Sequence, residues 1–112
     1  MAWLDSYTKT KWVEALRSGK YKQGRKALKT STHDGIFHYC CLGVLAEILD
    51  PDEWENRTVP VEGVSEYWHR GDMSFLDPDT LDMDIQEELA HKNDIGTSFE
   101  EIARLIERDD RI

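Results

Sequence analysis

Apolar residues recur along the chain at two spacings, and most of the chain follows the helical one. In the first such stretch Trp12, Ala15 and Leu16 share one face, and Gly19 stands where a helix commonly ends. The second stretch is apolar on almost every side, which is typical of a helix at the centre of a core. Its Gly43 predicts the close approach of another element. Helices are predicted over residues 9–18, 40–49, about 85–93 and 99–109.

Two short arms around an Asp-Gly pair predict one β-hairpin over residues 27–39, because Asp-Gly supplies the positive φ angles of tight hairpin turns. Residues 51–76 show no clear period, although residues 58–62 fit a short edge strand, since their proline cannot donate to a central ladder. We therefore expect a single domain, residues 1–112, of the α+β class. It should be small and mainly helical, with one short β-hairpin and a C-terminal helix pair.

Charge divides the chain unevenly. The net charge of the 112 residues is −9. Residues 1–33 hold eight basic and two acidic side chains, a net of +6, whereas residues 34–112 hold six basic and 21 acidic side chains, a net of −15. The basic third could meet an anionic ligand, or it could pair with the acidic remainder within one chain or between subunits.

The sequence contains no apolar run of the length that spans a bilayer, and its first residues lack the order of a signal peptide. We expect a protein of the cytoplasm with no membrane partner, in which Cys40 and Cys41 stay reduced.

Histidines and cysteines stand close together around residue 38. The spacing of His33, His38, Cys40 and Cys41 does not match the paired spacing of structural zinc ligands. A thiol at the start of a helix beside His38 could act as a nucleophile, but cysteines are more often simply buried. We expect neither a metal site nor a catalytic residue here, and no cofactor.

Acidic residues gather before and within the C-terminal helices. Asp77, Asp79, Asp82 and Asp84 lack the glycine and glutamate positions of a calcium loop, and helix capping explains them more simply. Residues 89–103 have the general look of a helix-turn-helix motif, but the connection is long and the last helix is rich in acidic residues that would repel DNA phosphates. Nucleic acid is not the partner that we expect.

The segment Gly19–Lys26 is the strongest candidate binding site, with two glycines, four cations, an aromatic residue and an amide in eight residues. Its cations could hold phosphate, and Gly24 could let backbone N–H groups approach it. Tyr21 could stack on a base while Gln23 reads its edge. The alternative is a solvated basic connection whose Tyr21 packs inward. The predicted ligand-binding residues are Trp12, Lys20, Tyr21, Lys22, Gln23 and Arg25.

Three stretches together resemble a widespread family of small bacteriophage proteins. They are Lys11–Gly24 (KWVEALRSGKYKQG), Cys40–Leu45 (CCLGVL) and Leu89–Ala103, which reads L-A-x-x-N-D-x-G-x-S-F-x-E-I-A. The family usually reads Phe-Cys-Cys, whereas His38 and Tyr39 intervene here, so we expect a local difference in the hairpin. The resemblance implies an accessory viral protein made in an infected bacterium.

Small viral proteins often inhibit host defence, and one class acts as a sponge: a homo-oligomer that captures a nucleotide signal without cleaving it. We therefore expect a non-enzymatic, homo-oligomeric phage protein that sequesters a small anionic nucleotide, an immune signal of the host, in the host cytoplasm. One alternative is a protein-interaction inhibitor or virion component that meets a host protein with its acidic surface. Another is a helix-turn-helix-like DNA-binding regulator.

Overall fold

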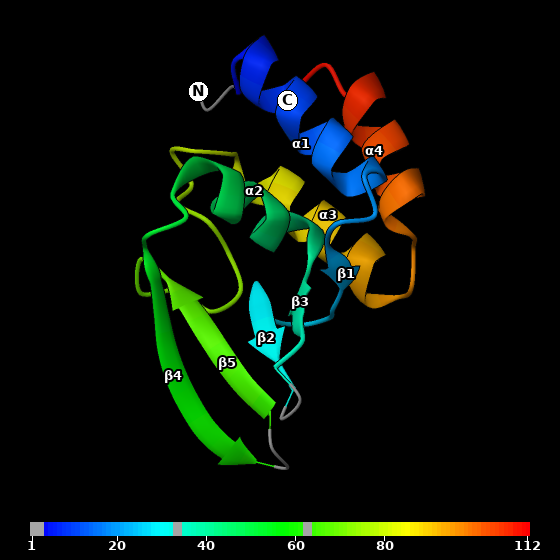
Figure 1. Ribbon diagram of the computed structural model, residues 1–112. Helices are drawn as coiled ribbons and strands as arrows, with labels where there is room; N and C mark the ends of the chain where they lie inside the picture. The colour runs from blue at the N-terminus through cyan, green and yellow to red at the C-terminus, as the bar shows by residue number, and fades with distance from the viewer. Residues whose placement is uncertain (1–3, 33–34, 62–63) are drawn as a thin grey trace.

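The computed structural model describes residues 4–32, 35–61 and 64–112, and within them the side chains of residues 56–61 and 64 are left undescribed. Within these ranges the chain forms four helices and a five-stranded sheet (Figure 1). In chain order the elements are α1 (Ser6–Arg17), β1 (Lys22–Gln23), β2 (Lys29–Ser31), β3 (Phe37–Tyr39), α2 (Cys41–Leu49), β4 (Trp54–Val61), β5 (Val64–His69), α3 (Met83–Asp94) and α4 (Phe99–Arg108).

The sheet has the strand order β1-β3-β2-β5-β4. Its middle contains the expected hairpin, in which β2 and β3 pair antiparallel with Lys29 opposite Tyr39 and Ser31 opposite Phe37. The predicted turn residues 33 and 34 lie outside the described part of the chain. β1 pairs in parallel with β3 at one edge, so the basic segment after α1 is held beside the hairpin.

A second hairpin, β4–β5, occupies the region that the sequence left irregular. Trp54 pairs with His69, and β5 joins β2 antiparallel with Tyr67 opposite Lys29. The predicted edge strand over residues 58–62 falls largely in the second half of β4, which lies at the edge of the sheet. The α+β class and the C-terminal helix pair are confirmed, and β4–β5 extends the sheet beyond one short hairpin.

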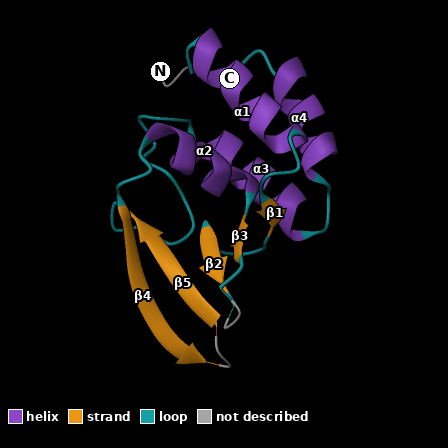
Figure 2. Cartoon of the chain, viewed as in Figure 1, coloured by secondary structure: helices purple, strands orange, loops and turns teal. Residues whose placement is uncertain are grey.

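The helices gather at one end of the sheet, and the β4–β5 hairpin extends away from them (Figure 2). α1 lies alongside α4, and α2 lies between this pair and the sheet (Figure 1). The molecule is therefore elongated, with principal extents of 40 × 25 × 22 Å. None of the helices in the described ranges has the length and apolar character that a membrane crossing needs.

α2 forms the centre of the core. Every residue from Cys41 to Ala46 is buried, as the apolar circumference of this stretch predicts. A Cβ atom placed on Gly43 would lie 1.7 Å from the backbone oxygen of Leu28, so the predicted close approach of another element at this glycine is confirmed. Leu28 precedes β2, and its carbonyl also accepts the N–H of Cys40. Gly43 therefore lets α2 sit directly on the hairpin.

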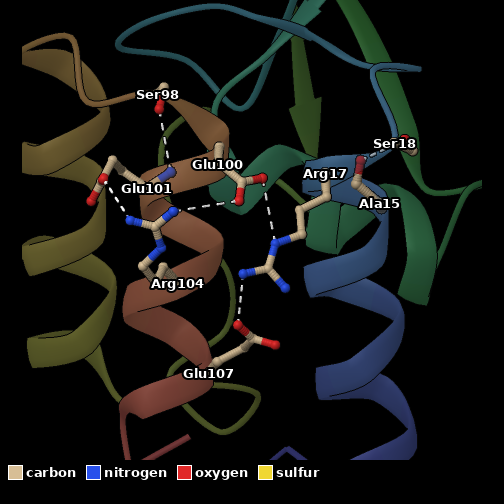
Figure 3. Close-up of polar contacts among 8 residues, drawn as sticks. All are labelled: Ala15, Arg17, Ser18, Ser98, Glu100, Glu101, Arg104 and Glu107. Atoms are coloured by element: carbon tan, nitrogen blue, oxygen red, sulfur yellow. Dashed lines mark hydrogen bonds and ion pairs between the residues drawn. The ribbon is translucent and has the colours of Figure 1, made fainter.

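Ion pairs join α1 to α4 (Figure 3). The Arg17 guanidinium contacts Glu107 at 2.7 Å and Glu100 at 3.4 Å, and the Arg104 guanidinium contacts Glu101 at 3.1 Å. Ser98 caps α4 by accepting the N–H of Glu101, as its capping-box sequence predicts. Much of the acidic charge at the start of α4 is therefore matched by arginines of the same domain.

Candidate anion-binding site

Residues 20–26, here called the basic segment, run from the end of α1 through β1 toward β2. Lys20, Lys22, Arg25 and Lys26 are exposed. No carboxylate in the described part of the chain forms an ion pair with any of these four side chains. Cations elsewhere do pair with carboxylates, among them Arg17, Lys29, Arg70, Arg104 and Arg111. The basic segment therefore keeps its positive charge free for solvent or a ligand.

Gln23 and Gly24 of this segment are engaged within the fold. The Gln23 amide nitrogen donates to Asn93 Oδ1 at 3.0 Å and to the Thr97 carbonyl at 2.7 Å. The Gly24 N–H donates to the Tyr39 carbonyl at 2.7 Å, so it is not directed at a phosphate. A Cβ on Gly24 would come within 3.0 Å of the His38 Cβ. This glycine thus serves the close packing of β1 against β3.

The two aromatic residues that the sequence assigned to a ligand also pack inward. Trp12 is completely buried, and its indole N–H donates to the Cys41 carbonyl at 2.9 Å. This core position is inconsistent with the predicted contact between Trp12 and a ligand. Tyr21 is half-buried and packs edge-on against Tyr39, with ring centroids 5.1 Å apart. Burial and the nearby Glu47 carboxylate raise the pKa of the Tyr21 phenol.

Asn93 connects the three stretches that carried the sequence resemblance. Its side chain is fully buried. Its Oδ1 accepts from the Gln23 amide and from the Cys41 N–H at 3.2 Å, and its Nδ2 donates to the Gly24 carbonyl at 2.8 Å. Sequence reasoning missed this residue. The signal that could have identified it is its spacing. Asn93 follows Leu89 by four residues, and Leu89 follows Ile85 by four, so a polar amide lies on the apolar face of α3.

A cavity of about 270 Å³, here called the Asp94 cavity, lies beside the basic segment. It is lined by Lys26, Cys40, Ser74, Phe75, Ala90 and Asp94. Lys26 has a left-handed backbone with φ of 69°, which is uncommon for a residue other than glycine. Its N–H donates to Asp94 Oδ1 at 2.9 Å, and its carbonyl accepts the Ser74 hydroxyl at 3.3 Å. Two residues of the cavity wall therefore hold Lys26 in place.

The thiols near this cavity are neutral at physiological pH. Cys40 is 5% exposed, and burial raises its pKa to about 11. Burial also raises the pKa of Cys41, and the adjacent Cys40 contributes to that rise. Neither thiol has the lowered pKa that a nucleophilic cysteine needs. Among the residues that the structure describes, which exclude His33, no three potential metal ligands gather.

Another cation, Lys29, lies in an aromatic box that sequence reasoning also missed. Its Nζ stands 4.6–5.4 Å from the centroids of four rings, those of Phe37, Tyr39, Trp54 and Tyr67. It also lies 3.6 Å from a carboxylate oxygen of Glu47 on α2. Strand pairing sets this arrangement, since Tyr39 and Tyr67 are the direct partners of Lys29. This buried cation is occupied internally and does not belong to the anion site.

Two larger hollows have no wall residue from the basic segment, although the first shares Phe75 with the Asp94 cavity. One of about 520 Å³ lies between the end of α2, the end of β5 and the loop before α3. Another of about 560 Å³ lies between α3 and α4. Neither is lined by a residue of the basic segment, whereas the wall of the Asp94 cavity includes Lys26.

A family profile described as a domain of unknown function, DUF8296, matches residues 4–84. The chain belongs to this family. The match to the DUF8296 domain runs from just before α1 into the first turn of α3, so it includes the basic segment and both cysteines but ends before Asn93 and Asp94. No curated protein and no solved structure matched the chain.

Proposed function

We propose that this DUF8296 domain is a non-enzymatic binding domain that holds a phosphate-bearing anion at the basic segment. The supporting observation is that Lys20, Lys22, Arg25 and Lys26 are exposed without a carboxylate partner in the described structure, although the chain carries a net charge of −9. Neighbouring unpaired cations raise the local positive potential and attract anions. Arginine adds a planar fork that matches two phosphate oxygens.

The ligand that we propose is a small nucleotide. In the bacteriophage setting that the sequence resemblance implies, binding without cleavage would withdraw a host immune signal from the cytoplasm. Such a sponge works by occupancy, so it needs affinity and abundance rather than a reaction centre. Assembly into a homo-oligomer is part of this proposal and would bring several basic segments together.

Calorimetric titration with ADP and with pyrophosphate tests the anion site. We expect both to bind, and the variant Lys22→Ala/Arg25→Ala to weaken both by at least about tenfold, because charge-assisted hydrogen bonds to phosphate are lost. Arg104→Ala is the matched control, since it removes an exposed arginine that is already paired with Glu101. The proposal fails if neither ligand binds at millimolar concentration, or if the control weakens binding equally.

The two other functions raised by the sequence receive less support. An acidic docking surface on α4 is partly neutralised, because Glu100, Glu101 and Glu107 pair with Arg17 and Arg104 (Figure 3). A DNA-reading role for α4 has two obstacles. The helix begins with exposed glutamates, and it lies along α1.

A further inference from the structure

The Asp94 cavity lies next to the free cations of the basic segment. It runs from the exposed Lys26 to the buried Cys40. Arg25 stands close by, because a Cβ on Gly96 would lie 3.3 Å from its Nη2 atom, and Gly96 is two residues beyond Asp94. A ligand whose anionic group meets Arg25 and Lys26 could therefore place another group in the cavity.

The size of the cavity limits that second group. Its volume of about 270 Å³ is slightly below the range of about 300–1,000 Å³ that is usual for sites enclosing a drug-sized ligand. A single ring system fits this volume, whereas a whole nucleotide does not. The sugar and phosphates of a nucleotide would have to remain outside, on the side where the basic segment lies.

The cavity walls favour a flat apolar group. Phe75 contributes an aromatic ring, Ala90 leaves space because its side chain is a single methyl group, and the Cys40 thiol is neutral because burial raises its pKa. Aromatic rings and neutral sulfur both make favourable contacts with heteroaromatic rings. These walls suit a nucleobase better than a second anion.

Asp94 supplies polar selectivity. The contacts that described residues make with its carboxylate both go to Oδ1, namely the Lys26 N–H at 2.9 Å and the Asn93 amide at 3.4 Å. Oδ2 therefore keeps its acceptor capacity among the described residues, and Asp94 belongs to the cavity wall. An ionised carboxylate accepts hydrogen bonds and cannot donate them, so it favours a group with an N–H and disfavours a carbonyl oxygen at the same place.

The backbone at the cavity is set in advance. Lys26 adopts its left-handed conformation with Asp94 and Ser74 bonded to its N–H and carbonyl. Backbone strain of this kind persists only where the surroundings hold it, and it concentrates at binding sites. The Lys26 side chain therefore starts from a fixed main chain beside the cavity before any ligand arrives.

From these observations we infer that the Asp94 cavity receives the base of a nucleotide whose phosphates lie on the basic segment, and that Asp94 selects a base with an exocyclic amino group. The inference rests on the proposed anion site and names the part of the ligand that the anion site alone does not recognise.

Titration with ADP, IDP and pyrophosphate tests the inference, because IDP carries a carbonyl oxygen where ADP carries an amino group. We expect ADP to bind at least about tenfold more tightly than IDP, since a site built around a hydrogen bond from the amino group discriminates strongly against an analogue with an acceptor at that position. Asp94→Asn keeps an oxygen for the Lys26 N–H and presents an amide N–H to the base. This variant should bind ADP more weakly and IDP more tightly than the parent protein does.

Ala90→Leu provides an independent test, because the larger side chain fills the cavity while the cations of the basic segment stay unchanged. It should reduce ADP affinity to that of pyrophosphate and leave pyrophosphate affinity unchanged. Circular dichroism melting shows whether each variant folds, and if Ala90→Leu does not fold, the Asp94→Asn result decides.

Equal affinities for ADP and IDP in both the parent and Asp94→Asn would overturn the base site. If Lys22→Ala/Arg25→Ala still weakened the binding of both ADP and pyrophosphate in that case, the anion site would stand on its own. Absence of binding by ADP and pyrophosphate to the parent protein would overturn both proposals together.

Discussion

A methyl group added at Gly43 would lie 1.7 Å from the carbonyl oxygen of Leu28. The neighbouring atom belongs to the backbone, so no side-chain rotation can relieve the clash. We expect Gly43→Ala to lower the free energy of unfolding by about 3 kcal/mol, the upper part of the usual range for overpacking in a core. Urea denaturation followed by circular dichroism measures this change.

Gly71→Ala is the matched control for this substitution. Gly71 has a positive φ of 84° but nothing within 4 Å of the added Cβ. Its replacement should cost about 1 kcal/mol, the penalty of a left-handed backbone without a clash. Similar losses in the two variants would show that contact with Leu28 is not what makes Gly43 necessary.

The sequence predicted the role of Gly43 but not that of Gly24. Gly43 lies within an apolar helix, and the absence of a side chain at such a position indicates close packing against another element. Gly24 lies among cations, where a glycine can serve a phosphate or a strand contact equally well. The parallel pairing of β1 with β3 decides between them, and that pairing joins residues distant in sequence.

At the scale of elements, periodicity located all the helices found in the described ranges, with ends that differ by a few residues from the predicted ones. The first half of β4 and the whole of β5 were missed because their residues include charged side chains, and each strand is specified by its partner rather than by its own pattern. β1 has two residues, too few to show the alternation of apolar and polar positions that predicts a strand.

Asn93 joins α3 to the segment after α1 and to the start of α2, and secondary-structure propensity cannot predict contacts of this kind. Replacing it with Ala would remove a buried partner from the Gly24 carbonyl, the Gln23 amide and the Cys41 N–H. We expect Asn93→Ala to lower the free energy of unfolding by about 2–4 kcal/mol, because lost partners for buried polar groups are costly. Thermal and urea denaturation measure the loss.

Gln23→Ala is the control for Asn93→Ala. It removes the contact between Asn93 and Gln23 but leaves the bonds from Asn93 to Gly24 and Cys41 in place. Its loss of stability should therefore be smaller. An Asn93→Ala protein as stable as the parent would show that water replaces the amide without penalty.

At the scale of the whole molecule, Lys29 joins the sheet to the helical end. Its ammonium contacts Glu47 of α2 and lies among rings from three strands. We expect Lys29→Met to lower the free energy of unfolding by about 2 kcal/mol, because the cation–aromatic attraction is lost and the partly buried Glu47 carboxylate is left without its cation.

A double-mutant cycle with Glu47→Gln isolates the ion pair. The double variant Lys29→Met/Glu47→Gln should be more stable than the sum of the single losses implies, since no uncompensated charge remains. Urea denaturation of the four proteins provides the cycle. Strictly additive losses would show that Lys29 acts through its ring contacts alone.

The charge distribution shows how far the candidate site could be predicted. The sequence left two explanations for the basic third of the chain, pairing within the protein and binding of an anionic ligand, and the structure shows internal pairing for part of this third. Arg17 and Lys29 pair with acidic residues of later elements, whereas Lys20 and Lys22 remain free of such partners in the described structure. The location of the basic segment was predictable, but its neighbours Asp94 and Phe75 were not, because only tertiary folding brings them there.

The pairing of α1 with α4 also constrains the order in which this domain can fold during its synthesis on the ribosome. The Arg17–Glu107 contact spans 90 positions of the chain, and the Lys9 ammonium donates to the Asp109 carbonyl across 100 positions. During synthesis α1 emerges well before its partner helix, and every other element of the fold is translated between the two. Trp12 of α1 can pack on α2 as soon as α2 has emerged, but the part of α1 that contacts α4 stays uncovered until α4 has left the exit tunnel, so native docking of these two helices is a late event in the biogenesis of the domain.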